Sequence, residues 1–171
     1  MSTTHIRDSL ASVARHFADH PQDALSVDSP AVAVLQHDLR CVAAGPNGAT
    51  MASDMPAAMG GGGTAPSPGW LLRAALANCD ATVIAMRAAQ LGIALQRLEV
   101  SVGSRSDDRG LLGVADGVPA GPLALRVHIR IAAAGVPPAR LRELVEWGEA
   151  HSPVGDAVRR AVPVESEIEL L

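Results

Sequence analysis

The sequence predicts a fold that combines helices with strands, and two observations support this prediction. Residues 70–91 are apolar on most sides and are followed by Gly92, a typical helix stop, which indicates a helix in the middle of the molecule. Residues 95–104 and 123–131 instead alternate apolar and polar side chains, as half-buried strands do. A chain of 171 residues can bury a core as one domain or as two closely packed halves.

Composition excludes several classes of function. The net charge of −4 and the scarcity of aromatic residues argue against a nucleic-acid partner. All 14 basic residues are arginines, which excludes lysine chemistry such as Schiff-base formation. No apolar run reaches the ~20 residues of a membrane span, and the N-terminus lacks a signal-peptide pattern. We therefore expect a cytoplasmic protein with no membrane partner and with reduced cysteines.

The first predicted elements are a helix and short strands. Residues 6–17 place apolar side chains at helical spacing and predict an amphipathic helix, which ends at His20-Pro21. We assign residues 1–30 to this N-terminal helical arm and residues 31–171 to the main domain. Short strands are predicted at residues 31–35, 39–44 and 49–53, the last two joined by a turn at residues 45–48.

A long loop precedes the central helix. Residues 54–69 are rich in glycine, proline and small side chains and lack periodicity, and a loop of this length is suspected of function. Its four consecutive glycines, Gly60 to Gly63, lack the Lys-Ser/Thr pair of a phosphate-binding loop. We interpret them as a site of flexible close packing.

The C-terminal part is predicted to contain a helix and a last strand. The helix begins at Pro137-Pro138 and ends near residue 150, and a short helical turn follows. The last strand, residues 162–170, has an acidic face, and the strand at residues 123–131 has a basic one. These faces consist of Glu165, Glu167 and Glu169, and of Arg126, His128 and Arg130. We expect the two strands to pair through these charges; two separately solvated faces are the alternative.

Five short motifs in a fixed order point to a family. They are Gly61-Gly62, Pro68 with Leu71-Leu72, Ala75-Leu76 with Asn78-Cys79, Gly92-Ile93 with Leu95, and Ser152-Pro153-Val154. Together they resemble the OsmC/Ohr family of thiol-dependent peroxide reductases over about residues 39–170. The resemblance implies an α+β, OsmC-like fold with two long helices packed between curved antiparallel sheets. It also implies an intertwined homodimer with active sites at the subunit interface, and the apolar central helix agrees with such an assembly.

The resemblance also assigns candidate site residues. In the family, a mid-helix cysteine attacks the peroxide, and a second cysteine before Pro-Val condenses with the resulting sulfenic acid. These positions are Cys79 and Ser152 here, and a serine hydroxyl cannot form that disulfide, so the chain is a divergent member without the second cysteine. The glutamate that holds an arginine over the family's thiolate corresponds to Gly69. Arg40 is the nearest candidate for that arginine.

The reactivity of Cys79 depends on its surroundings. Its neighbours on the helix are apolar, so desolvation alone favours the neutral thiol, and a reactive thiolate needs a cation within about 4–6 Å. The candidates are Arg40, Arg105, Arg109 and His151. With such a cation, the protein is a one-cysteine peroxidase that reduces organic hydroperoxides and uses an external thiol as reductant. Without it, the protein is a non-catalytic relative that binds a small apolar ligand at the dimer interface or serves only assembly.

The remaining polar residues offer weaker alternatives. Cys41 has the pattern of a buried strand cysteine. His151 and Ser152 lack a third group that would make them a hydrolytic pair. The six histidines show no metal-ligand spacing, so no metal and no other cofactor is expected.

Overall fold

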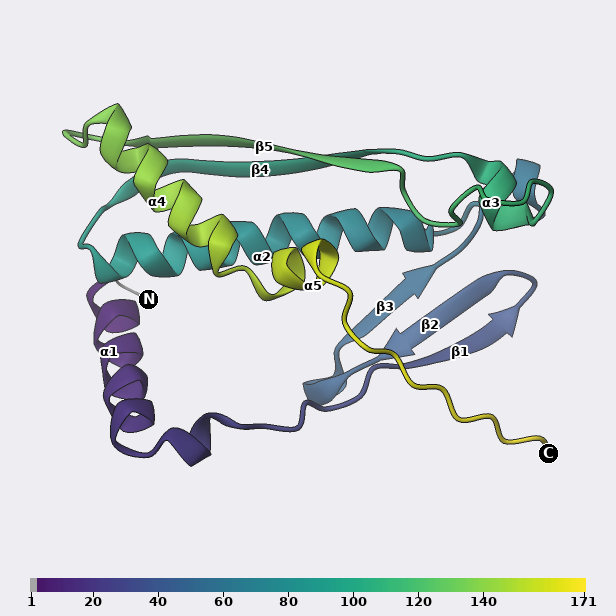
Figure 1. Cartoon of the computed structure of the whole chain (residues 1–171), viewed down its shortest axis with the longest axis horizontal. Helices are drawn as coiled ribbons and strands as arrows, with labels where there is room; N and C mark the ends of the chain where they lie inside the picture. The colour runs from purple at the N-terminus through teal and green to yellow at the C-terminus, as the bar shows by residue number, and fades with distance from the viewer. Residues whose placement is uncertain (1–2) are drawn as a thin grey trace.

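The computed structural model describes residues 3–171 as helices and two antiparallel sheets around the long helix α2 (Figure 1). The α-helices are α1 (Thr3–Asp19), α2 (Pro68–Gln90), α3 (Asp108–Leu112), α4 (Pro138–Ala150) and α5 (Pro153–Arg159). The strands are β1 (Val32–His37), β2 (Arg40–Ala44), β3 (Thr50–Ser53), β4 (Leu95–Arg105) and β5 (Ala124–Ala133). The predicted α+β class is therefore confirmed.

Helix α2 forms where the sequence predicts it. The Ser67 hydroxyl accepts the N–H of Trp70 at 3.3 Å and caps the helix, and Pro68 occupies the first turn. Gly92 ends it with a φ of 69°. The buried side of the helix repeats every four residues, with Leu76, Asp80, Ile84 and Ala88. This spacing directs one face of α2 into the protein.

The buried core lies where α4 crosses α2. Ile84, Ala88 and Leu144 form it, and side chains of β4 and β5 cover it from the sheet side. Gly148 permits the close approach of the two helices, because a Cβ atom there would lie 2.4 Å from the Ile84 Cγ1 atom. The predicted second helix is confirmed as α4.

Strands β4 and β5 pair in an antiparallel ladder from Leu95 opposite Ala133 to Arg105 opposite Ala124. The two predicted half-buried strands are thus confirmed. Their connection contains the short helix α3, where the sequence predicts only a loop. Asp107 caps this helix, and Gly113 ends it with a φ of 65°.

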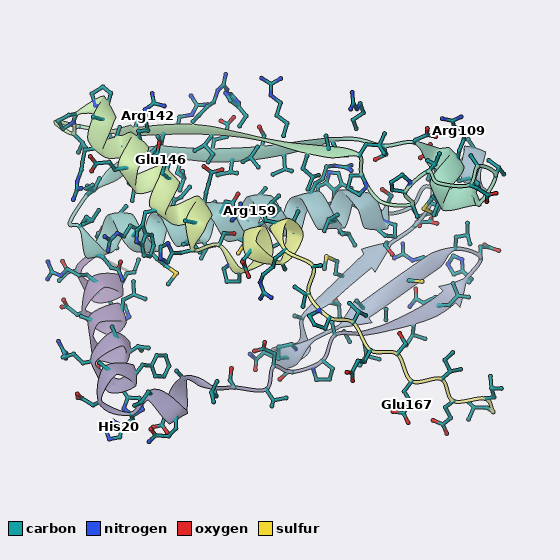
Figure 2. The ribbon with its side chains drawn as sticks, viewed as in Figure 1. His20, Arg109, Arg142, Glu146, Arg159 and Glu167 are labelled. Carbon is teal, nitrogen blue, oxygen red and sulfur yellow. The ribbon has the colours of Figure 1, made fainter. Side chains whose placement is uncertain are left out.

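The predicted last strand is wrong in this structure. Residues 161–171 form no strand and pair with no other element. Helix α5 directs them away from β5 and toward the β1–β3 sheet, and Glu167 lies on this isolated segment (Figures 1 and 2). On the basic face of β5, Arg130 instead pairs with Glu99 of β4. Glu99 lies opposite Arg130 and accepts a hydrogen bond from it at 3.3 Å.

The N-terminal region matches its predicted elements. Helix α1 has no buried residue, and β1, β2 and β3 form a separate sheet in that order. The predicted turn between β2 and β3 contains two residues with positive φ, Asn47 at 56° and Gly48 at 73°. The division into an arm of residues 1–30 and a domain of residues 31–171 stays a prediction.

Candidate functional site

Cys79 lies near the middle of α2 with its side chain half-buried. Its sulfur accepts a hydrogen bond from the backbone N–H of Val154, at 3.5 Å. Val154 belongs to the first turn of α5, whose backbone N–H groups point out of the helix start. A donor in this position stabilises negative charge on the sulfur.

Ser152 lies beside the same turn and is fully buried. Its hydroxyl oxygen accepts the N–H of Gly155 at 3.1 Å and caps α5. The structure therefore brings Cys79 and Ser152 to neighbouring backbone donors of one helix turn. In the position that the resemblance gives to a second cysteine, this chain has a helix cap.

Three of the four candidate cations contact other groups. Arg40 begins β2 and donates to the Thr64 hydroxyl at 2.9 Å. Arg109 on α3 pairs with Asp107, the residue before this helix. Arg109 lies far from α5 in the molecule (Figure 2). His151 stacks on the Trp147 ring with 3.9 Å between centroids. Within residues 3–171, neither these groups nor Arg105 donates a hydrogen bond to the Cys79 sulfur.

Arg40 is instead connected to a buried carboxylate that sequence reasoning missed. Asp54 is only 2% exposed. It accepts the N–H of Met55 at 2.8 Å, of Gly62 at 3.3 Å and of Thr64 at 2.9 Å, and the Thr64 hydroxyl at 2.8 Å. The two bonds from Thr64 are the largest cause that lowers the pKa of Asp54 from 3.8 to about 2.

Asp54 thus organises the glycine-rich loop before α2. Gly61 is required there, because a Cβ atom would lie 2.0 Å from the Met55 carbonyl oxygen. Close packing is therefore the role of at least this glycine, as predicted. The sequence does contain a signal for the role of Asp54: it is an aspartate that begins a glycine-rich loop, and such loops offer backbone N–H groups without partners.

Asp80 is a second buried acid and follows Cys79 in the chain. It is 2% exposed, and its Oδ1 atom has no hydrogen-bond partner within the described residues. A buried carboxylate oxygen without a partner is unfavourable for folding. Asp80 lies on the buried side of α2 with Leu76 and Ile84.

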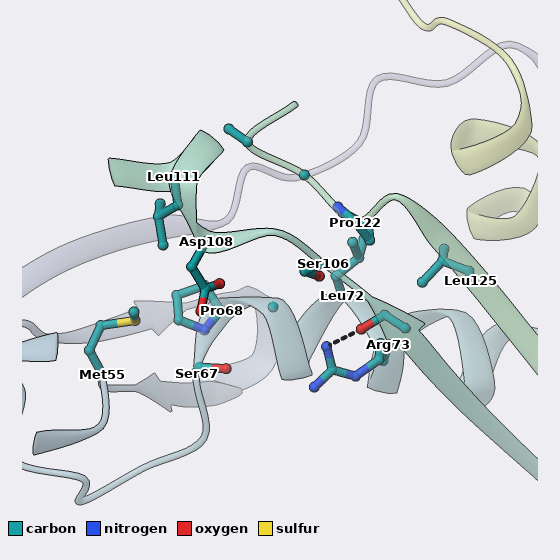
Figure 3. Close-up of a pocket in the computed structure, with 14 residues that line it drawn as sticks. Met55, Ser67, Pro68, Leu72, Arg73, Ser106, Asp108, Leu111, Pro122 and Leu125 are labelled. Carbon is teal, nitrogen blue, oxygen red and sulfur yellow. Dashed lines mark hydrogen bonds between the residues drawn. The ribbon is translucent and has the colours of Figure 1, made fainter. Parts of the chain in front are cut away.

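A cavity of about 420 Å³ lies at the start of α2, between this helix, α3 and the adjoining ends of β4 and β5 (Figure 3). Arg73 and Gly69 both line it. The Arg73 guanidinium donates to the Ser104 hydroxyl at 2.9 Å. Cys79 is not among the residues that form its wall.

Two further properties concern metals and membranes. No group of three or more His, Cys, Asp or Glu side chains in residues 3–171 is arranged to hold a metal ion. Over the same residues, no helix combines the length and apolar character needed to cross a membrane.

The fold and the site define an α+β protein with one cysteine in its central helix, close to the start of a capped short helix. The profile of the OsmC-like protein family matches residues 60–167. This chain belongs to the OsmC-like family. No curated protein sequence matches it.

Three solved structures show the same fold. An OsmC-like protein from Mycoplasma pneumoniae is 17% identical, with 80% of this chain and 91% of that chain covered and a TM-score of 0.68. An organic hydroperoxide resistance protein OsmC from Legionella pneumophila is 20% identical, with 79% and 91% covered and a TM-score of 0.57. The organic hydroperoxide resistance protein OhrB of Bacillus subtilis is 20% identical, with 79% and 93% covered and a TM-score of 0.52.

Proposed function

We propose that this protein reduces organic hydroperoxides in a stress response, with Cys79 as its single peroxidatic cysteine. The observation that supports this best is the position of the Cys79 sulfur, half-buried on the central helix and facing a backbone donor of α5. Family membership supports it as well, since similar folds belong to proteins named for organic hydroperoxide resistance. We place the reaction in the cytoplasm, where thiol reductants are present.

The reaction proceeds in two stages. The Cys79 thiolate attacks one peroxide oxygen, so an S–O bond forms while the O–O bond breaks, and the alkoxide leaves and takes up a proton to become the alcohol. The sulfur is oxidised by two electrons to sulfenic acid. One external thiol then displaces water and forms a mixed disulfide with Cys79. A second external thiol releases the cysteine and leaves as the external disulfide.

We propose a homodimer as the active form, with active sites at the subunit interface and Arg40 as the candidate cation for Cys79. Large apolar side chains are exposed on several elements, and such exposure is typical of surfaces that meet another protein. They include Val34 and Leu35 on β1, Trp70 on α2, and Val164 and Ile168 on the C-terminal segment. Sedimentation equilibrium tests this assembly: a mass of two chains supports it, and a mass of one chain at all concentrations contradicts it.

The test of the function is peroxide consumption with a dithiol reductant. Cys79→Ser should abolish the turnover of cumene hydroperoxide, because the serine hydroxyl cannot be oxidised in this way. Cys41→Ser is the matched control, since it removes the other cysteine from β2, and it should retain full turnover. Equal turnover by Cys79→Ser and the natural chain would refute the proposal.

A non-catalytic, ligand-binding role is the second candidate. It is favoured by one observation, that Arg40, Arg109 and His151 all contact other groups in the single chain. The relative alkylation rates of the two cysteines distinguish the candidates. A catalytic Cys79 reacts faster with iodoacetamide near neutral pH than Cys41, because the thiolate is the nucleophile. A Cys79 that reacts more slowly than Cys41 supports the non-catalytic role.

A further inference from the structure

We propose that the cavity at the start of α2 binds a small apolar monocarboxylate, whose carboxylate is held by Arg73. This inference goes beyond the proposed peroxide chemistry, because the site does not use Cys79. Arg73 lines the cavity and precedes Cys79 by six positions, which correspond to about 9 Å along the helix axis. Binding and peroxide reduction can therefore be tested separately.

Arg73 offers unused hydrogen-bond donors inside this cavity. Residue Arg73 is half-buried as a whole, and its guanidinium donates to the Ser104 hydroxyl at 2.9 Å. No carboxylate in residues 3–171 lies within ion-pair distance of it, whereas Arg97, Arg109 and Arg140 each pair with an acid. A guanidinium has five N–H donors in a planar fork that matches a carboxylate. Arg73 can therefore bind a carboxylate while it keeps its bond to Ser104.

Gly69 keeps the space beside Arg73 open. Gly69 precedes Arg73 by one helical turn, so a side chain at this position would face the guanidinium. A Cβ atom there would lie 3.8 Å from the Arg73 Nη1 atom and 4.0 Å from the Ser67 hydroxyl oxygen, which is ordinary contact. A glutamate would fit and would pair with Arg73. With glycine here, Arg73 keeps its bond to Ser104 and has no carboxylate partner among residues 3–171.

The remaining wall favours an apolar ligand body. The larger apolar side chains that line the cavity are Met55, Pro68, Leu72, Leu111, Pro122 and Leu125 (Figure 3). Its volume of about 420 Å³ lies in the range of small-molecule sites. Ser106 and the exposed Asp108 add polar groups, and the negative charge of Asp108 disfavours a ligand with a second carboxylate. One carboxylate on a short hydrocarbon body matches this lining.

The test uses the full chain, isothermal titration calorimetry and three linear probes with the same number of carbon atoms. Octanoate should bind, whereas 1-octanol and octylammonium should bind at least about tenfold more weakly, since only the carboxylate can form a bidentate ion pair with Arg73. Cys79→Ser should bind octanoate as the natural chain does. Failure of peroxide reduction would therefore leave this result unaffected.

Two variants locate the site. Arg73→Gln should weaken octanoate binding about tenfold or more, and Arg126→Gln is the control, because it removes the same charge from an exposed position on β5 that does not line the cavity. Gly69→Glu should abolish binding while Arg73 remains present. Circular dichroism checks that each variant is folded.

Three outcomes overturn the proposal. They are an absence of octanoate binding to the natural chain, equal affinity for octanoate and 1-octanol, and unchanged octanoate affinity in Arg73→Gln. If Arg73→Gln is unfolded, Gly69→Glu decides: retained octanoate affinity in a folded Gly69→Glu variant contradicts the assignment.

Discussion

Two regions of this protein differ in how they use apolar residues. Where α4 crosses α2, Ile84 is completely buried and Leu144 is 2% exposed. In the sheet of β1–β3, every residue of β1 is exposed. Val34 is 60% exposed, although valine is a residue type that strands usually bury in a core. The first region completes its core within one chain. The second has apolar surface that a single chain leaves open, and the homodimer proposed above would cover it.

The largest effect should come from removing a core side chain in the first region. Ile84→Ala should lower the free energy of unfolding by about 2–5 kcal/mol, since it removes buried volume between α2 and α4. Val34→Ala is the matched change in the exposed sheet, and it should alter the stability of an isolated chain by less than about 0.5 kcal/mol.

Urea unfolding at several protein concentrations measures both variants. A larger loss for Val34→Ala that appears only where the protein is dimeric would sharpen the comparison, because it would place β1 in the subunit contact. If both variants lower the free energy of unfolding of the monomer equally, the contrast between the two regions is contradicted.

A second effect concerns the polar anchor of the loop after β3. The folded-state pKa of Asp54 is lowered from 3.8 to about 2 by the donors of Thr64, Met55 and Gly62. The stabilisation by the carboxylate is therefore fully present above about pH 4 and is lost as the pH falls through about 2. The natural chain should be more stable than Asp54→Asn at neutral pH, and this advantage should shrink below pH 4.

Unfolding midpoints of the two proteins from pH 7 to pH 2 provide the measurement. The difference between them isolates Asp54 from the other acids that titrate in this range. A difference that stays constant down to pH 2 would show that the carboxylate charge does not hold the loop.

A smaller effect is expected where α5 begins. Ser152→Ala removes the cap of α5 and should lower the free energy of unfolding by about 0.5–2 kcal/mol. Because the same turn supplies the donor to the Cys79 sulfur, this variant should also change the alkylation rate of Cys79 and leave that of Cys41 unchanged. Ser152→Thr keeps a hydroxyl cap and serves as the control. Unchanged stability in Ser152→Ala would show that the cap contributes nothing.

The sequence predicted the elements whose patterns are local. Helix α2 is long, apolar and bounded by Ser67 and Gly92. Strands β4 and β5 alternate apolar and polar side chains over residues 98–102 and 125–131, so periodicity was sufficient. Helix α3 was missed because five residues are too few for a periodic pattern. The prediction of a last strand was wrong, because alternation in residues 162–170 shows only which face a strand would bury. Whether a partner strand lies beside this segment depends on the direction in which α5 leads the chain.

The candidate site was predicted unevenly for similar reasons. The proximity of Cys79 to the Ser152 turn followed from the resemblance, because no periodic pattern connects residues so far apart in the chain. Asp54 was missed, since its partners are backbone groups of a folded loop. The cation for Cys79 could not be assigned from the sequence, because several arginines were possible and only their tertiary positions distinguish them.

The central claim is that the peroxide oxidises the sulfur atom of Cys79. The most direct measurement is peptide mass spectrometry after one equivalent of cumene hydroperoxide, with dimedone present to trap sulfenic acid. We predict a dimedone adduct on Cys79 in the natural chain and in Cys41→Ser, and no adduct in Cys79→Ser. An adduct confined to Cys41, or none on either cysteine, would contradict the claim.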